Sequence, residues 1–164
     1  MSMIDTLRAL VGADAVLDAT DVATRSAGVM RQDKLQAAAL VRPKTTEEVS
    51  AVMRWCHANG VPVVTHGGLT GLAHRSDADA NSVILSLERM RTIEDINPRE
   101  RTATVQAGVV LQALQEAVDP HELAFPLDLG ARGSATLGGN AATNAGGNRV
   151  IRYGMMRDMV LGLE

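Results

Sequence analysis

The sequence has little of several residue types, and each shortage excludes a class of protein. Its 164 residues include a single cysteine, Cys56, so one chain cannot build a disulfide framework or a cysteine-rich zinc site. Aromatic residues amount to 2% and the formal net charge is -3, which leaves neither the stacking platforms nor the basic stripe of a nucleic-acid binder. We therefore predict no nucleic-acid partner.

Long apolar runs and targeting segments are also missing. No run approaches the roughly 20 apolar residues that cross a bilayer, and residues 1–10 contain Asp5 without the basic start of a secretory signal. The histidines do not have the spacing of metal ligands: His57, His66, His74 and His121. We expect a protein of a reducing, cytoplasmic compartment, with no membrane span and no bound metal.

Glycine, in contrast, is concentrated in two places. Of the 15 glycines, seven lie between Gly130 and Gly154, and three more lie between Gly67 and Gly71. Glycine loses more conformational freedom on folding than any other residue, so clusters in an Ala- and Val-rich chain need a local reason. We interpret both segments as candidate functional loops.

Apolar periodicity predicts short elements in the N-terminal part of the chain. Residues 4–11 have helical spacing that ends at Gly12, whereas residues 14–36 have no sustained pattern and are expected to form a connecting arm. The apolar run 37–41 predicts a strand that stops at Pro43.

A compact strand–helix–strand unit follows. Thr45 and Glu48 have the spacing of a capping box, and the helix that they start ends at Gly60. Its apolar positions form one stripe: Val49, Val52, Met53 and Cys56. The run 61–64 predicts a buried strand, with a right-handed parallel crossover from the strand before the helix. The glycine loop at 66–72 comes directly after this strand.

The remaining elements are expected to be a strand at 83–87, a hairpin of strands 93–96 and 101–107, a helix at 111–118 and a terminal apolar strand at 159–163. Residues 125–153 lack periodicity, and an irregular stretch of that length in a compact protein is normally functional or disordered.

These elements predict an α+β fold in three parts. Residues 1–36 form a helix and arm, residues 37–119 a first lobe with the strand–helix–strand unit, and residues 120–164 the start of a second, mixed-sheet lobe. Because an apolar run stands at the end without a turn, we expect a polypeptide cut within a domain. An unfinished sheet exposes an edge, which makes a homo-oligomer an additional expectation.

The loop Gly67–Gly71 has the composition of an anion-binding nest. Consecutive glycines allow successive backbone N–H groups to turn toward one ligand, which suits a pyrophosphate. The loop is neither a Walker loop nor a GxGxxG fingerprint. A tight turn between strands explains the same residues equally well.

The segment Phe125–Gly154 is rich in Gly, Asn and Thr. Gly138-Gly139-Asn140 and Asn144–Gly147 would let backbone approach a large flat ligand, and the amide side chains supply donors and acceptors. Such a neutral, donor-rich wall suits an isoalloxazine ring. The alternative is a glycine-rich linker.

Taken together, these motifs resemble the FAD-linked oxidase and dehydrogenase family, with an FAD-binding domain of the vanillyl-alcohol oxidase and p-cresol methylhydroxylase type. The resemblance runs from about Ala39 to Glu164 and is carried by RPKTTEEVSAVMRWC, THGGLTGL, SVILSLERMRTIEDINPRERTATVQAGVVLQALQEAV, FPLDLG, TLGGNAATNAGGNR and RYGMMRDMVLGLE. The most similar branches are the FAD-linked chain of bacterial glycolate oxidase, D-lactate dehydrogenase and D-2-hydroxyglutarate dehydrogenase.

The resemblance implies two groups of FAD-binding residues. The pyrophosphate would lie on Gly67, Gly68, Leu69, Thr70 and Gly71, flanked by His66 and Leu72. The flavin and its ribityl chain would be lined by Pro126, Asp128, Gly130, Thr136, Gly138, Gly139, Asn140, Thr143, Asn144, Gly146 and Gly147, with a strand at 161–164 beside the nucleotide. Covalent relatives often carry His where this chain has Leu69, so non-covalent FAD is expected. Ala73–Arg75 departs from the small residues of many relatives.

The activity implied is oxidation of a D-2-hydroxy acid, with a hydride passing from the substrate to flavin N5. Family members hold the substrate in a later domain, so this chain is expected to lack catalytic residues, to be inactive alone and to need a C-terminal substrate domain or a partner chain. Two alternatives are an FAD-carrying electron-transfer subunit and a structural fragment that holds no ligand.

Overall fold

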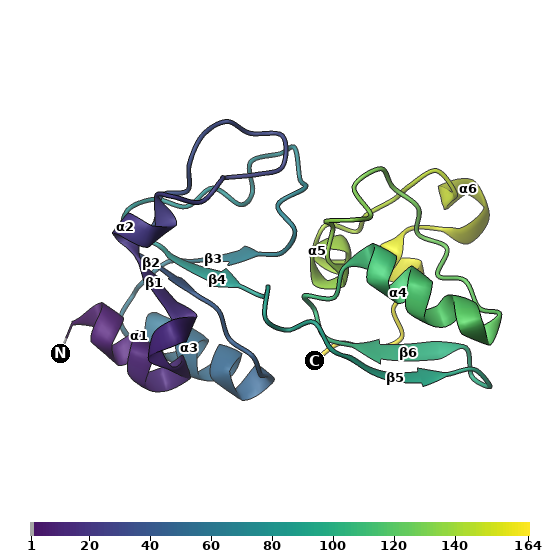
Figure 1. Ribbon diagram of the computed structural model, residues 1–164, viewed down its shortest axis with the longest axis horizontal. Coiled ribbons are helices and arrows are strands. Elements are labelled where there is room, and N and C mark those ends of the chain that lie inside the picture. The colour runs from purple at the N-terminus through teal and green to yellow at the C-terminus, as the bar shows by residue number, and fades with distance from the viewer. Residues whose placement is uncertain (1) are drawn as a thin grey trace. The chain divides into compact units, whose positions relative to one another are not determined.

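The computed structural model describes residues 2–164 and divides into two compact units, an N-terminal unit (residues 2–90) and a C-terminal unit (residues 91–164) (Figure 1). The fold is α+β, as predicted. The division after Met90 differs from the expected boundary after residue 119, since the hairpin and the helix that follows it lie in the C-terminal unit.

The N-terminal unit is built on a four-stranded mixed sheet with the order β1-β2-β4-β3. Its strands are β1 (Val16–Asp18), β2 (Ala39–Val41), β3 (Val63–His66) and β4 (Val83–Ser86). β2 and β3 both pair with β4 in parallel, so the predicted parallel crossover is confirmed, with β4 inserted between its two strands. All four residues of β4 are buried, as expected for a central strand covered on both faces.

The expected connecting arm is wrong for its first residues. A 3-10 turn η1 (Ala13–Ala15) leads into β1, which pairs antiparallel with β2, and α2 (Ala19–Val22) follows. The Asp18 carboxylate caps α2 by accepting from the backbone N–H groups of Thr20 and Asp21. A three-residue strand is too short for its alternation to be distinguished from chance.

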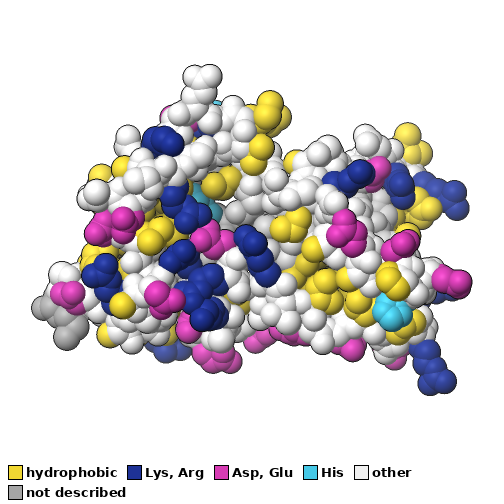
Figure 2. Space-filling model, in the orientation of Figure 1, with side chains coloured by type: hydrophobic (Ala, Val, Ile, Leu, Met, Phe, Trp, Pro, Cys, Tyr) yellow, Lys and Arg dark blue, Asp and Glu magenta, His cyan; other side chains and the backbone are white. Residues whose placement is uncertain are grey.

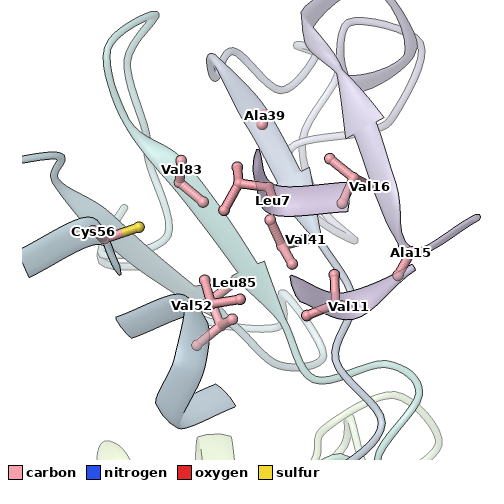
Figure 3. Close-up of a cluster of buried hydrophobic side chains, with 10 residues drawn as sticks. All are labelled: Leu7, Val11, Ala15, Val16, Ala39, Val41, Val52, Cys56, Val83 and Leu85. Atoms are coloured by element: carbon pink, nitrogen blue, oxygen red, sulfur yellow. The ribbon is translucent and has the colours of Figure 1, made fainter. Parts of the chain in front are cut away.

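Two helices pack on the sheet and form the core of this unit (Figure 3). α1 (Met3–Val11) ends at Gly12, which has a φ of 90°, and α3 (Thr46–Ala58) starts at its predicted cap. Side chains from α1, η1, α3 and the strands meet in one apolar cluster: Leu7, Val11, Ala15, Val16, Ala39, Val41, Val52, Cys56, Val83 and Leu85. The predicted stripe of α3 is confirmed at Val52 and Cys56 but wrong at Met53, which is 42% exposed.

The C-terminal unit begins with the predicted hairpin, β5 (Ile93–Asn97) and β6 (Thr102–Val105), followed by α4 (Leu111–Val118) and η2 (Asp119–His121). The register shifts between Ile93 and Asp95. In a regular strand, residues three apart face opposite sides, and a bulge restores them to one side. Ile93 and Ile96 accordingly pack against the same apolar cluster as α4.

The segment 125–153, expected to be irregular, contains two short helices, α5 (Leu137–Ala142) and α6 (Val150–Tyr153), and the 3-10 turn η3 (Met156–Met159) follows it. The predicted terminal strand is wrong. Met159 ends η3, and residues 160–164 have no regular structure, with Leu161 85% and Leu163 82% exposed. No strand within residues 2–164 pairs with this segment, and an isolated strand cannot satisfy its backbone groups.

Candidate functional site

The glycine loop Gly67–Gly71 leaves β3 at the carboxyl end of the parallel strands, the edge where ligands bind in open α/β sheets. Within residues 2–164, none of its five backbone N–H groups donates to a protein acceptor. Gly67 to Thr70 are half-buried and Gly71 is exposed. A row of free, partly shielded donors is a suitable binding surface for an anion.

The left-handed residue of this loop is Leu69, with a φ of 54°, rather than one of the glycines. Its carbonyl oxygen accepts a hydrogen bond of 3.2 Å from the backbone N–H of Val29. A Cβ at Gly28 would lie 3.3 Å from the same oxygen, so the two loops are closely packed. Segment 25–35, expected only as a connecting arm, therefore supports the glycine loop.

His66 faces the protein rather than the loop's free donors. It is 2% exposed, and its Nε2 lies 2.8 Å from the carbonyl oxygen of Ser76. Burial lowers the pKa of His66, although the hydrogen bond to Ser76 opposes that effect. Leu72, the other flanking residue, is 81% exposed.

A charged cluster at the same edge of the sheet was missed by the sequence analysis. Arg25 donates to Glu88 from both terminal guanidinium nitrogens, at 2.5 and 3.3 Å, and the Ser86 hydroxyl donates to the same carboxylate at 3.1 Å. Arg42 lies 3.5 Å from it. Burial raises the pKa of Glu88, but the combined effect of these partners is larger and opposite, so the net shift of the pKa is downward. The positions of Arg42 just after β2 and of Glu88 just after β4 could have indicated part of the cluster.

A second set of charges ties the outer half of the loop to segment 25–35. The Arg31 guanidinium binds both Asp33 and Asp77, and the His74 ring lies 3.1 Å from Asp77. The hydrogen bond from Arg31 lowers the pKa of Asp77 below its ordinary value. Figure 2 shows basic and acidic side chains interspersed on the visible face of the N-terminal unit.

In the C-terminal unit, two of the predicted ligand-lining glycines have internal packing roles. A Cβ at Gly138 would lie 2.7 Å from the Cβ of Ala107, and one at Gly147 would overlap the carbonyl oxygen of Asp128. At Gly130, in contrast, a Cβ would meet no heavy atom within 4 Å. Gly130 has open space for a ligand, whereas Gly138 and Gly147 are explained by close contacts within the chain.

Most of the predicted polar residues already have partners. The Thr136 hydroxyl caps α5 by accepting from Gly139 N–H, and the Thr143 hydroxyl donates to the Gly139 carbonyl. The side-chain oxygen Oδ1 of Asn144 accepts from the backbone N–H of Arg157 at 3.0 Å. Asp128 forms ion pairs with two arginines, Arg132 and Arg149.

Asn140 is different from these residues. Its side chain is 5% exposed, and its Nδ2 is a buried donor with no hydrogen-bond partner within the described residues. An unpaired buried amide costs about 1–3 kcal/mol, so such a group calls for a ligand or another polar partner. Of the other predicted residues, Gly146 has space for a Cβ, which would make an ordinary van der Waals contact with Met155. Pro126 is half-buried.

Residues 2–164 contain no group of three metal-binding side chains and no helix long and apolar enough to cross a membrane. Cys56 is buried in the core, where burial raises the pKa of its thiol.

The family described as "FAD binding domain" matches residues 37–164. The chain belongs to this FAD-binding domain family. It is 49% identical over 126 residues to a D-2-hydroxyglutarate dehydrogenase of Xanthomonas citri pv. viticola, covering 77% of this chain and 27% of the relative. It is 38% identical over 164 residues to the D-2-hydroxyglutarate dehydrogenase of Stutzerimonas stutzeri, covering 99% of this chain and 35% of the relative.

Solved structures of other proteins have the same fold as this FAD-binding domain. An alkyldihydroxyacetonephosphate synthase gives a TM-score of 0.84 with 23% identity, covering 96% of this chain and 31% of that chain. A p-cresol methylhydroxylase gives a TM-score of 0.70 with 24% identity, covering 87% of this chain and 29% of that chain. The domain thus has the predicted vanillyl-alcohol oxidase type of fold, and its cofactor is FAD. It spans about a quarter to a third of the length of these relatives.

Proposed function

We propose that the chain holds FAD non-covalently as the cofactor domain of an enzyme that oxidises a D-2-hydroxy acid. The observation that carries this proposal is the row of five backbone N–H groups in Gly67–Gly71 that have no acceptor among residues 2–164, at the carboxyl edge of the parallel strands. These donors fit the two negative charges of a pyrophosphate, and Leu69 offers no side-chain nucleophile for a covalent flavin bond.

In the C-terminal unit, the unpaired Nδ2 of Asn140 fits a flavin edge, which carries hydrogen-bond acceptors. Gly130 offers open space beside backbone for a large ligand. When bound, the flavin supplies the two-electron acceptor for the oxidation of a C–OH group, while the protein binds and orients it. We propose that the remaining predicted residues contact the flavin through their backbone atoms, because several of their side chains already form hydrogen bonds within the chain.

Two relatives named D-2-hydroxyglutarate dehydrogenase support a D-2-hydroxyglutarate type of substrate over glycolate or D-lactate. Since the chain spans about a quarter to a third of these relatives, we propose that substrate binding needs further polypeptide and that the chain alone does not oxidise the acid. A cytoplasmic location stays a prediction, because the relatives also include mitochondrial proteins.

The test is FAD retention after desalting, measured by flavin absorbance at about 450 nm. Gly68→Asp places a carboxylate against the pyrophosphate and is expected to weaken FAD binding at least tenfold, which corresponds to about 1.4 kcal/mol. Asn140→Ala removes the unpaired donor and is expected to weaken binding by about tenfold. The matched control is Ala80→Asp, which adds the same charge at an exposed position of the N-terminal unit.

Equal retention by Gly68→Asp and the control would show that the glycine loop does not hold the pyrophosphate. A folded wild-type chain that retains no FAD would contradict the proposal for this polypeptide. Bleaching of the bound flavin by D-2-hydroxyglutarate under nitrogen would contradict the proposed inactivity.

A further inference from the structure

The segment between His66 and Ser76 carries every residue of the glycine loop. Its first residue is buried at the end of β3, and the backbone N–H of Leu87 donates to the His66 carbonyl at 3.1 Å, which fixes this end to the strand beside it. The imidazole Nε2 then lies 2.8 Å from the Ser76 carbonyl oxygen. One side chain therefore closes the loop at its base.

The direction of this hydrogen bond follows from the acceptor. A carbonyl oxygen can only accept, so Nε2 carries the proton and donates it. The charged groups that face the ring are Arg25, Glu88 and Asp77, which come from three different segments. Arg25 and Glu88 are paired with each other at 2.5 Å, so the ring faces a compensated pair rather than a single charge.

Two further contacts hold the loop beyond its base. The Leu69 carbonyl accepts from Val29 N–H, and Asp77 pairs with Arg31. Both of these partners belong to segment 25–35 at the surface, and Asp77 is 45% exposed. The contact made by His66 is the buried one, and it is the only one of the three that links the loop to the sheet.

We propose that His66 is a positioning residue: its Nε2–H anchors Ser76 and thereby holds the N–H groups of Gly67–Gly71 in one place for an anionic ligand. The identity of that ligand, the pyrophosphate of FAD, rests on the proposed function. This role differs from the direct cofactor contact that the sequence suggested for His66, because the buried ring faces Ser76.

Two neutral, polar substitutions separate the hydrogen bond from mere burial. In His66→Gln the amide nitrogen reaches the position of Nε2 and keeps the donor. In His66→Asn the side chain is one methylene shorter and cannot reach Ser76. Both variants remove the ring and differ by one methylene, so rescue of wild-type behaviour by His66→Gln reports the hydrogen bond.

The first readout is limited trypsin cleavage after Arg75, which is exposed and adjacent to Ser76. Cleavage in a native protein requires local opening of the chain. We expect His66→Asn to raise the cleavage rate about tenfold and His66→Gln to stay within about twofold of wild type. Cleavage after Arg132, an exposed residue of the C-terminal unit, serves as the internal reference and is expected to stay unchanged.

The second readout is the Kd for FAD, measured by quenching of flavin fluorescence. His66→Asn is expected to raise it about tenfold, with rescue by His66→Gln. Equal cleavage after Arg75 in all three proteins would overturn the anchor, and faster cleavage with an unchanged Kd would overturn its role in positioning. If no protein binds FAD while His66→Asn alone is cleaved faster, the proposed function fails and the anchor stands.

Discussion

Gly130 and Gly147 belong to the same glycine-rich segment, but their surroundings are opposite. Neither has a positive φ, so backbone conformation does not require glycine at either position. At Gly147, the Asp128 carbonyl oxygen occupies the place of a Cβ, and Asn148 N–H donates to that oxygen at 2.9 Å. At Gly130 the Cβ position is open.

We expect Gly147→Ala to destabilise the chain by about 3 kcal/mol, because a methyl group that overlaps a backbone oxygen forces two chain segments apart. Gly130→Ala is the matched control and is expected to stay within about 0.5 kcal/mol of wild type. Urea unfolding followed by circular dichroism measures both. Equal urea midpoints for the two variants would mean that the backbone at Asp128 and the backbone at Gly147 do not approach each other this closely.

At the scale of elements, α3 provides the sharpest local test. The Thr45 hydroxyl accepts from Glu48 N–H at 3.2 Å, and the Glu48 carboxylate accepts from Lys44 N–H at 2.7 Å. The hydroxyl half of the predicted capping box is therefore confirmed, whereas the Glu48 carboxylate binds the N–H of the residue before the N-cap instead of the N-cap itself.

Thr45→Ala is expected to cost about 1 kcal/mol, since it leaves an N-terminal donor of α3 without its acceptor. Thr45→Ser keeps the hydroxyl and is expected to recover most of that loss. Trp55 lies in α3 and is the single tryptophan of the chain, so its fluorescence during urea unfolding reports this unit directly. A Thr45→Ser variant as unstable as Thr45→Ala would argue against capping by the hydroxyl.

The elements that the sequence predicted correctly carry strong local signals. α3 has a cap and a stripe, α4 ends before Pro120, and the β5–β6 hairpin surrounds a turn. The missed elements depend on distant partners: β1 exists because it pairs with β2, and α5 because Gly138 fits against Ala107. Residues 159–163 show the converse, since an apolar run without a neighbouring strand does not form one.

The candidate site divides in the same way. The position of the glycine loop after a strand was predictable, because an apolar run and glycine content are local signals. The predicted burial of that strand is wrong, since β3 lies at the edge of the sheet and only His66 in it is buried. The support of the loop by Val29 and the Arg25–Glu88 pair were not predictable, since each joins residues that are far apart in the sequence. The closure by His66 spans ten residues of a loop without periodicity, so no local pattern indicates it. The binding roles assigned to individual residues stay predictions that FAD titrations can test.

At the scale of the whole chain, each unit has its own apolar core. The clusters around β2 and β4 belong to the N-terminal unit, and a separate cluster around α4 belongs to the C-terminal unit. The β5–β6 hairpin contributes Ile93, Ile96 and Val105 to the cluster around α4, which explains why the boundary between the two units lies before the hairpin. Stability measurements should therefore follow a probe within one unit, and Trp55 serves the N-terminal unit.

His66 gives the N-terminal unit a pH dependence of definite sign. Its pKa is lowered in the folded protein by burial, whereas in the unfolded chain it stays near 6.5. As pH falls below that value, the unfolded chain binds a proton that the folded chain does not, so the free energy of unfolding decreases. The pKa values of Glu88 and Asp77 are also lowered, so these carboxylates act in the same direction, but only when the pH falls into the ordinary range of carboxyl pKa values.

We therefore expect the free energy of unfolding to fall between about pH 7.5 and pH 5.5, with a contribution from His66 of at most about 1.4 kcal/mol at the lower pH. His66→Gln cannot titrate but keeps the proposed hydrogen bond to Ser76, so its loss over the same interval is expected to be smaller. Urea titrations followed by Trp55 fluorescence at the two pH values measure the difference. An equal loss of unfolding free energy in the two proteins would show that protonation of His66 is not coupled to folding. A wild-type chain that becomes more stable at the lower pH would mean that the ring is charged in the folded state.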